Sequence, residues 1–298
     1  MTPEISERDA AVLPDEPLSR HTTLRIGGPA RFYCRVKTEE GLSRVLAAAR
    51  DSGKPLALLG MGSNVLAADE GFPGWVVRLE GDFLRVSIEG DRLTAGGGAV
   101  LGGACAAAAR AGLSGLEAIT GIPSSIGGAV RINAGAYGGE IFQILETVRL
   151  VARDGSRREA VASEIPHGYR WTALCDTGEI VSEATLRLRP ASREEIAERT
   201  RVVSEKRRGA LPGEPNAGSI FKNPPGDYAG RLIEACGLKG TREGDAEIST
   251  RHANVIVNLG QARSADALSL MRAMRDAVRE KFGVTLSPEV EFLGLKWS

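Results

Sequence analysis

Glycine is concentrated in a few short stretches of this chain, and this distribution restricts the fold more than any other feature. The sequence holds 37 glycines in 298 residues, roughly 12% against a usual value of about 7%. In the densest stretch, three close turns follow one another: Gly121-Ile122-Pro123, Gly127-Gly128 and Asn133-Ala134-Gly135-Ala136-Tyr137-Gly138. So many positions without a Cβ atom allow a flat ligand to lie against the backbone. The alternative is a compact Ω-type loop packed on itself.

A second glycine turn, Gly60–Asn64, follows an apolar run. It presents unobstructed backbone N–H groups together with the polar side chains of Ser63 and Asn64, a combination that suits a phosphate. Val65 stands where a third glycine would complete a Rossmann fingerprint, and no P-loop motif occurs. The alternative is the plain end of a strand.

Charge and hydropathy exclude several classes of protein. Lysine plus arginine (38) equals aspartate plus glutamate (38), so the formal net charge is zero. A nucleic-acid or membrane-surface protein would carry a basic excess, and neither partner is expected. No apolar run approaches the roughly 20 residues of a membrane span, and the N-terminal segment lacks the hydrophobic region of a secretion signal. We therefore expect a cytoplasmic globular protein.

The residue types that often hold metals are dispersed. His21, His167 and His252 show no ligand spacing, so no metal is expected. The cysteines fit a reducing compartment as small core side chains; they are Cys34, Cys105, Cys175 and Cys236.

The expected elements divide the chain into three zones, residues 1–80, 81–190 and 191–298, and predict an α+β protein because strands and helices do not alternate strictly. In the first zone, Thr38 is a candidate N-cap for a helix. The helix would bury Leu42, Val45, Leu46 and Ala49, and strand-like runs follow at 55–59 and 75–79.

In the second zone, Asp154-Gly155 predicts a hairpin. The expected strands are 83–88, 92–95, 148–153 and 180–188, with an alanine-rich helix at 99–111.

In the third zone, Ser192 and Glu195 form a capping-box pattern. The expected helices are 192–208, 228–235 (stopped by Gly237) and 264–281, and strand-like segments lie at 252–258 and 289–293. The last helix would bury Ala267, Leu268, Met271 and Met274.

The segment PNAGSIFKNP, residues 215–224, collects reactive and polar groups. It carries a hydroxyl (Ser219), an ammonium (Lys222) and two carboxamides (Asn216 and Asn223). The alternative for each of these residues is a polar surface loop. No GxSxG nucleophile elbow occurs anywhere in the chain.

Seven segments occur in an order that resembles one enzyme family. They are HTTLRIGGPARF (21–32), LLGMGSNVL (58–66), the glycine-rich segment 112–140, GYR (168–170), PNAGSIFKNP, AGRLIEACGLKG (229–240) and LSPEVEFLG (286–294). Together they resemble the UDP-N-acetylenolpyruvoylglucosamine reductases, also called UDP-N-acetylmuramate dehydrogenases, in their shorter, second type. The resemblance covers about residues 18–294.

The resemblance implies a fold of two FAD-binding subdomains of the vanillyl-alcohol oxidase type, followed by a C-terminal α+β substrate-binding domain. We also expect a monomer. Non-covalent FAD would take a hydride from NADPH, and the reduced flavin would pass it to C3 of the enolpyruvyl group of the UDP-sugar substrate. The residues implied to hold FAD are Gly60, Met61, Gly62, Ser63, Asn64, Gly121, Ile122, Pro123, Gly127, Gly128, Asn133, Gly135, Ala136, Ile180, Val181 and Arg207.

The resemblance also implies the catalytic groups. Ser219 would protonate C2, Arg170 would hold the substrate carboxylate with its donor fork, and Glu289 would assist the enolate if a raised pKa kept it protonated. Substrate contacts are implied for Tyr169, Lys222 and Asn223.

Two positions depart from the family pattern. Ala210 stands where a basic residue is usual, so that Arg208 or Lys206 would have to replace it, and Glu291 stands where Arg or Lys often lies near the flavin. The competing interpretations are another flavoenzyme of the same fold, which would often tether FAD through His or Cys, and a non-catalytic nucleotide-binding protein.

Overall fold

The computed structural model describes residues 6–297, with the side chain of Ala210 excepted. By its internal contacts the chain divides into two compact units. Unit 1 consists of the described residues up to Leu13 with Tyr33–Gly60 and Trp75–Arg207, and unit 2 of Pro14–Phe32, Met61–Gly74 and the residues from Arg208 on. The first of the three sequence zones is therefore shared between the units. The boundaries near residues 80 and 190 stay predictions.

The N-terminal part forms a four-stranded sheet in the order β1-β2-β5-β3. Its strands are β1 (Ala10–Pro17), β2 (Pro29–Val36), β3 (Leu56–Leu58) and β5 (Phe72–Leu79), and β3 runs parallel to β5. The sequence analysis predicted β3 and part of β5 but missed β1 and β2. Burial along β1 and β2 departs from strict alternation, so the period of two that indicates a strand is weak there.

Helix α1 (Glu39–Asp51) begins where the sequence predicts. The Gly41 amide donates to the Thr38 hydroxyl over 3.0 Å, which confirms the N-cap. The predicted face, Leu42, Val45, Leu46 and Ala49, is buried.

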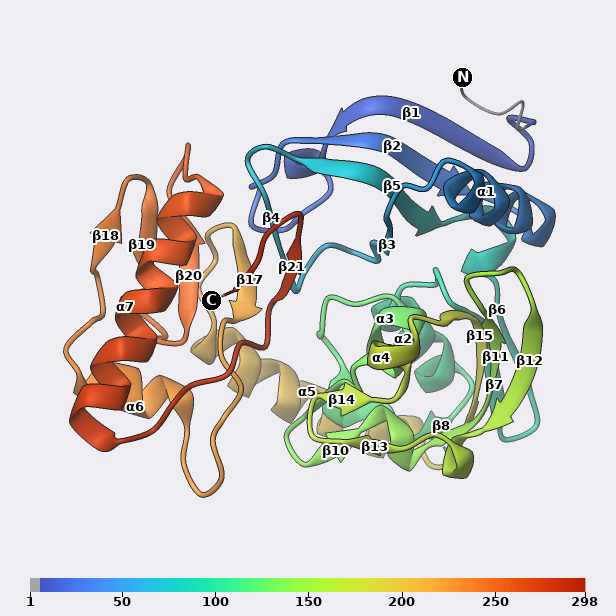
Figure 1. Cartoon of the computed structure of the whole chain (residues 1–298). Helices are drawn as coiled ribbons and strands as arrows, with labels where there is room; N and C mark the ends of the chain where they lie inside the picture. The colour runs from blue at the N-terminus through green and yellow to red at the C-terminus, as the bar shows by residue number, and fades with distance from the viewer. Residues whose placement is uncertain (1–5, 298) are drawn as a thin grey trace. The chain divides into compact units, whose positions relative to one another are not determined.

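Unit 1 contains an antiparallel five-stranded sheet in the order β12-β11-β15-β7-β6. Its strands are β6 (Val86–Glu89), β7 (Arg92–Gly96), β11 (Leu145–Val151), β12 (Arg157–Val161) and β15 (Ile180–Arg187). Helices α2 (Leu101–Arg110) and α3 (Ile126–Arg131) pack against this sheet (Figure 1). Their apolar side chains and those of the sheet form one buried core.

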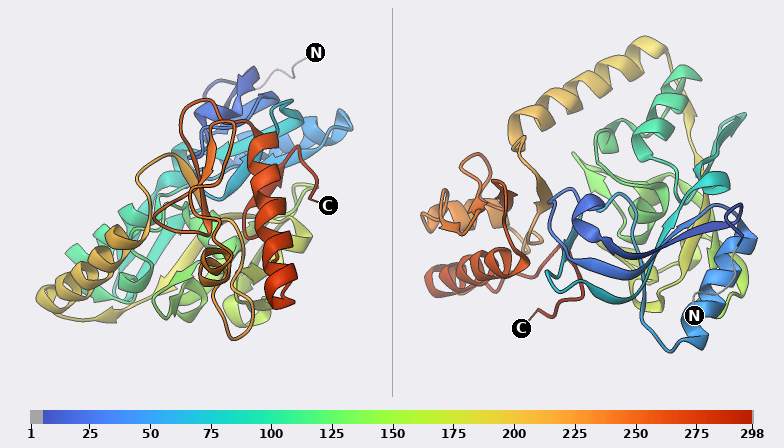
Figure 2. Two further views of the ribbon diagram at one scale, coloured as in Figure 1. Left: turned by 90° about the vertical axis from the view of Figure 1, so that its left-hand side faces the viewer. Right: turned by 90° about the horizontal axis from the view of Figure 1, so that it is seen from above.

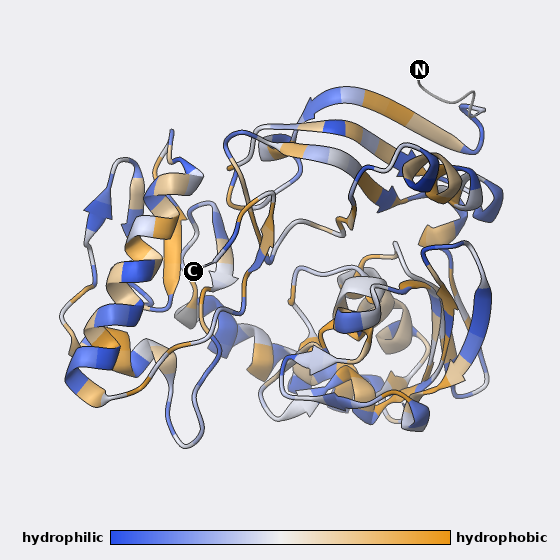
Figure 3. Ribbon diagram, in the orientation of Figure 1, coloured by the Kyte–Doolittle hydropathy of each residue, from blue (hydrophilic) through white to orange (hydrophobic). Residues whose placement is uncertain are grey.

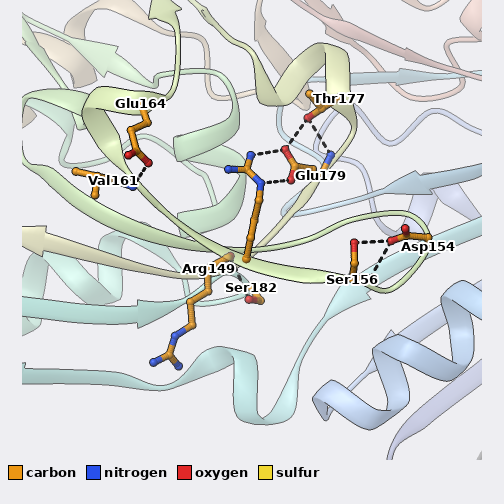
Figure 4. A network of polar contacts seen from close by, with 9 residues as sticks. Arg149, Asp154, Ser156, Val161, Glu164, Thr177, Glu179 and Ser182 are labelled. Carbon is orange, nitrogen blue, oxygen red and sulfur yellow. Dashed lines mark hydrogen bonds and ion pairs between the residues drawn. The ribbon is translucent and has the colours of Figure 1, made fainter.

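The predicted hairpin between β11 and β12 is confirmed. At its turn the Asp154 carboxylate accepts hydrogen bonds from the Ser156 amide over 2.8 Å and from the Ser156 hydroxyl over 2.7 Å (Figure 4). This local bond stabilises the turn that the Asp-Gly pair predicts.

One predicted strand was placed too early. The segment from Gly81 to Leu84 is a 3₁₀ turn, and β6 begins only at Val86. Phe83 is buried in this turn. Burial of one aromatic ring fits a turn and a strand equally well, so the apolar pattern did not separate them.

The remaining elements of unit 1 are short. They are β8 (Leu113–Ser114), β9 (Gly135–Ala136), β10 (Gly139–Glu140), β13 (His167–Gly168), β14 (Trp171–Thr172), α4 (Leu174–Thr177) and β16 (Arg189–Pro190), with 3₁₀ turns at Glu117–Ile119, Ile141–Gln143 and Ala162–Glu164.

Helix α5 (Arg193–Ala210) starts with the predicted capping box. The Glu195 amide donates to the Ser192 hydroxyl over 3.2 Å, and the Ser192 amide donates to the Glu195 carboxylate over 3.4 Å. These two reciprocal bonds satisfy backbone donors that the first turn leaves open.

Unit 2 contains an antiparallel sheet in the order β17-β20-β19-β18. Its strands are β17 (Asn216–Ser219), β18 (Arg242–Glu243), β19 (Ala246–Ile248) and β20 (Val255–Asn258). In addition, β4 (Val65–Ala67) pairs in parallel with β21 (Glu291–Leu293). Strands β20 and β21 each begin later than the sequence predicts.

Helices α6 (Ala229–Ala235) and α7 (Ser264–Phe282) pack on each other and on this sheet. Figure 2 shows α7 as one uninterrupted helix, and Figure 3 shows its alternating apolar and polar faces. The predicted face is buried, with Ala267, Leu268, Met271 and Met274 in the core of unit 2. In the described part of the chain no helix is long and apolar enough to cross a membrane.

The N-terminus of α7 is held by a residue distant in sequence. The Asp69 carboxylate accepts from the Ser264 amide over 2.9 Å and from the Ala265 amide over 3.4 Å, and the Ser264 hydroxyl accepts from the Asp69 amide over 3.0 Å. A carboxylate at this end also complements the helix dipole. Asp69 therefore joins the β4–β5 connection to α7.

We predict that Asp69→Ala lowers the free energy of unfolding by about 1–2 kcal/mol, because the first turn of α7 loses its cap. Urea unfolding measures this loss. Asp51→Ala is the control, since Asp51 is exposed and makes only an ion pair with Arg50 at 3.5 Å; it should change stability by no more than about 0.5 kcal/mol. Equal effects of the two substitutions would contradict a capping role for Asp69.

Candidate functional site

The turn Gly60–Asn64 has the backbone geometry of an anion cradle. Gly62 has a φ of +65°, and a Cβ atom there would lie 2.0 Å from the His21 carbonyl oxygen. Among the described residues, the amides of Gly60, Met61 and Gly62 donate to no protein acceptor. Consecutive open amides in a tight turn bind anions such as phosphate. The turn therefore suits the ligand that the sequence predicts.

In unit 2 this turn meets two other motifs. The Asn64 carboxamide donates to the Glu289 carbonyl over 3.0 Å, and the Glu291 amide donates to the Asn64 carbonyl over 2.9 Å. The Glu289 amide in turn donates to the Ile220 carbonyl over 2.8 Å, next to Ser219. One side-chain bond and two backbone bonds thus bring the glycine turn, the serine motif and the Pro-Glu-Val motif together.

Ser219 lies at the end of a bulge in β17. Asn216 pairs with Val257 and Ser219 with Val255, so three steps along β17 face two along β20. Such bulges re-aim a side chain and occur next to active sites. The Ser219 side chain is half-buried, and within residues 6–297 its hydroxyl makes no hydrogen bond. This hydroxyl is thus not used to hold its own loop.

Lys222 and Asn223 follow on the same segment. The Lys222 amide donates to the Ser287 carbonyl over 2.9 Å, while its half-buried ammonium has no ion-pair partner in the described part of the chain. The Asn223 carboxamide oxygen accepts from the Ala229 amide over 3.0 Å, so it holds the first residue of α6. The predicted substrate contact of Asn223 stays a prediction.

In unit 1, Arg170 occupies a strained position. Its φ is +55°, in the left-handed region that only a small fraction of non-glycine residues adopt. One guanidinium nitrogen donates to the Gly135 carbonyl over 2.6 Å, and the guanidinium carbon lies 5.2 Å from the Tyr169 ring centroid. Non-glycine strain of this kind clusters at functional sites.

Asn133 connects Arg170 to the β9–β10 hairpin. It is fully buried, with its side-chain amide donating to the Glu140 carboxylate over 2.8 Å and to the Gly168 carbonyl over 3.0 Å. Its carboxamide oxygen accepts from the Phe142 amide over 3.3 Å. The Asn133 side chain is therefore hydrogen-bonded to the protein itself. Its predicted contact with the cofactor would have to come from its backbone, and this contact stays a prediction.

Arg207 lies close to the same hairpin. Its side-chain stem would meet a Cβ atom at Gly121 at 3.2 Å, and within the described residues its guanidinium makes no hydrogen bond or ion pair. Burial lowers the pKa of Arg207; the Tyr137 phenol opposes this shift and the Arg170 cation adds to it. The guanidinium groups of Arg170 and Arg207 therefore lie close enough to interact electrostatically.

The other predicted cofactor positions lie on the surrounding backbone. The Gly127 amide donates to the Gly97 carbonyl over 2.8 Å and the Gly128 amide to the Ser125 hydroxyl over 3.2 Å, so both amides serve the protein itself. Ile180 and Val181 are buried in β15. Ile122 and Ala136 are half-buried, and Pro123 is exposed.

At the departures from the family pattern, Glu291 begins β21, and the side chain of Ala210 is outside the described residues. In the part of the chain that the structure describes, no three His, Cys, Asp or Glu side chains are arranged to hold a metal ion. The sequence analysis did not single out Thr23, whose side chain bonds to the serine motif. The sequence feature that could have indicated Thr23 is its position in HTTLRIGGPARF, one of the seven segments that resemble the family.

Comparisons with known proteins agree with this arrangement. A family model described as an FAD binding domain matches residues 30–160, and one described as the C-terminal domain of UDP-N-acetylenolpyruvoylglucosamine reductase matches residues 211–293.

Curated relatives match over nearly the whole chain. UDP-N-acetylenolpyruvoylglucosamine reductase 2 of Symbiobacterium thermophilum is 46% identical over 280 residues, which is 94% of this chain and 91% of that protein. The reductase of Moorella thermoacetica is 45% identical over 284 residues, 95% of this chain and 93% of that protein.

A crystal structure of the reductase from Thermus caldophilus matches with a TM-score of 0.84 at 43% identity, covering 95% of this chain and 99% of that chain. The expected combination of an FAD-binding fold with a C-terminal domain is thereby confirmed. The chain belongs to the family of UDP-N-acetylenolpyruvoylglucosamine reductases.

Proposed function

We propose that this chain reduces the enolpyruvyl ether of UDP-N-acetylenolpyruvoylglucosamine to the lactyl ether of UDP-N-acetylmuramate, a step of peptidoglycan precursor synthesis. NADPH is the source of the hydride and FAD its carrier. The observation that carries the proposal is that hydrogen bonds join Asn64 to Glu289 and Glu289 to Ile220. These bonds join residues 61–64 of the anion-binding turn to the serine motif within unit 2.

The residues present fit FAD. The open amides of Gly60, Met61 and Gly62 suit its diphosphate, and Arg207 suits a negatively charged part of a ligand. Burial raises the pKa of the Cys34 thiol to about 12, so this thiol is a poor nucleophile for a covalent tether. When bound, FAD supplies the hydride that reaches C3 of the substrate.

The chain's own residues then act on the substrate. Arg170 binds the carboxylate of the enolpyruvyl group through its planar donor fork, in the orientation that its bond to Gly135 supports. Ser219 donates a proton to C2 from a hydroxyl that makes no hydrogen bond to the residues that the structure describes. Glu289 assists the enolate as a proton-bearing group, and Tyr169, Lys222 and Asn223 contact the substrate.

The proposal includes a monomer that acts in the cytoplasm without nucleic acid or membrane as a partner. The balance of 38 basic and 38 acidic residues supports the expectation that neither nucleic acid nor a membrane surface is a partner. Light scattering on the purified holoprotein tests the monomer.

An anaerobic experiment tests the function. We expect the purified protein to carry FAD that acid precipitation releases, and NADPH to bleach its visible absorption. Addition of the enolpyruvyl sugar nucleotide should then restore the spectrum of oxidised flavin. Failure to bind FAD, or reduced flavin that this substrate does not reoxidise, would contradict the proposal.

Substitution of Ser219 tests the proton donor. We expect Ser219→Ala to retain FAD and normal reduction by NADPH, while turnover per flavin falls by about 10²-fold or more. Ser219→Cys should recover part of the activity, because a thiol with a reference pKa of about 8.5 is a stronger acid. Near-normal reoxidation by substrate in Ser219→Ala would remove Ser219 from the mechanism.

Substitution of Arg170 tests carboxylate binding. Arg170→Lys keeps a charge but removes the donor fork, so we expect reoxidation by substrate to slow by about tenfold or more while NADPH-driven reduction is retained. The control is Arg189→Lys, since Arg189 is exposed on β16. Equal reoxidation rates in the two variants would exclude the assigned role.

A further inference from the structure

We infer that Thr23 is a positioning residue for Ser219, tying the bulged strand β17 to the turn at Gly62 through one side-chain hydroxyl. The inference rests on the proposed function, because it assigns Thr23 a part in placing the proton donor. It uses contacts within unit 2 alone.

Thr23 makes the link with both its hydroxyl and its backbone. The hydroxyl donates to the Asn216 carbonyl over 2.7 Å, and the Gly62 carbonyl lies 3.3 Å from the same oxygen. The Thr23 amide also donates to the Gly62 carbonyl over 3.0 Å. Loss of the hydroxyl therefore leaves the backbone bond from Thr23 to Gly62 in place, but removes the hydrogen bond from Thr23 to Asn216.

The segment that carries Thr23 is itself held firmly. The buried Thr22 hydroxyl donates to the Ile26 carbonyl over 2.9 Å. The buried Asn258 carboxamide donates to the Leu24 carbonyl over 3.0 Å, and Asn258 belongs to β20, the partner strand of β17. Thr23 thus has fixed neighbours on both sides and can act as an anchor.

At the bulge such an anchor adds to the pairing of β17 with β20. Because the Ser219 hydroxyl has no hydrogen bond within the described residues, its direction depends on the backbone that carries it. After the bulge, the Ile220 amide donates to the Asn254 carbonyl over 2.9 Å and the Ile220 carbonyl accepts from Glu289 over 2.8 Å. Before the bulge, Thr23 holds Asn216. Both ends of the bulge are then fixed. The backbone that carries the serine hydroxyl is fixed with them.

Thr23 could instead serve stability alone, and Thr22 offers a matched comparison. Thr22 and Thr23 are adjacent, and each hydroxyl donates to a backbone carbonyl at similar distance. The bond of Thr22 stays within its own turn, whereas that of Thr23 reaches the serine motif, 193 residues away. A role in stability predicts equal effects from the two residues; a positioning role does not.

The test compares Thr23→Val, Thr22→Val and Thr23→Ser as holoproteins. For each we would measure the melting temperature, FAD per chain, the rate of flavin reduction by NADPH and the rate of reoxidation by substrate. We expect both valine variants to lose a similar number of degrees of melting temperature and to keep FAD. Only Thr23→Val should slow reoxidation, by about tenfold or more, since a small displacement of a reacting group is costly. The KM for the substrate should stay within about threefold.

Rescue supplies the second readout. Thr23→Ser retains the hydroxyl and should reoxidise at a rate within about threefold of the parent protein. If Thr23→Val is not obtained folded, Thr23→Cys replaces it with the same expectation, because a thiol is a weak donor. Equal reoxidation rates in the two valine variants, or no rescue by serine, would overturn the inference. A parent protein that the substrate does not reoxidise would instead overturn the proposed function.

Discussion

The hydrogen bonds that join Asn64, Ile220 and Glu289 are the interaction on which the arrangement of unit 2 depends; one comes from the Asn64 side chain and the other from the Glu289 backbone. They connect β4, β17 and β21 at the point where the glycine turn, the serine motif and the Pro-Glu-Val motif meet. Gly62 allows this approach, since a Cβ atom there would lie 2.0 Å from the His21 carbonyl. A side chain at this position would displace the segment that carries Thr23 and, with it, the support of the serine strand.

In unit 1, hydrogen bonds offset two features that oppose stability, one at Arg170 and one at Arg207. Arg170 keeps a left-handed backbone conformation, a strain of about 1–3 kcal/mol for a non-glycine residue. Arg207 is half-buried beside the Arg170 cation, and both burial and that cation lower its pKa. The hydrogen bonds of Asn133 and Gly135 hold this arrangement in place.

The sequence predictions are correct where the interaction joins residues that are close together in the sequence. The caps at Thr38 and Ser192, the turn at Asp154 and the buried face of α7 are confirmed, because each depends on residues within a few positions of one another. Strands β1 and β2 were missed because their burial does not alternate regularly. The start of β6 was wrong because the buried ring of Phe83 fits a turn as well as a strand.

By itself, the sequence determined the α+β class, the family and the set of candidate residues, since these depend on local patterns and on the order of motifs. Only the tertiary structure decided that Asn64 meets Glu289, 225 residues further along the chain, and that Thr23 meets Asn216. It also decided that the Asn133 side chain is hydrogen-bonded inside the protein, whereas the Ser219 hydroxyl has no such bond within residues 6–297. The physical reason is that the two long-range contacts, from Asn64 and from Thr23, end on backbone carbonyl groups. Every residue carries such a group, so no pattern of side chains records which of them will meet.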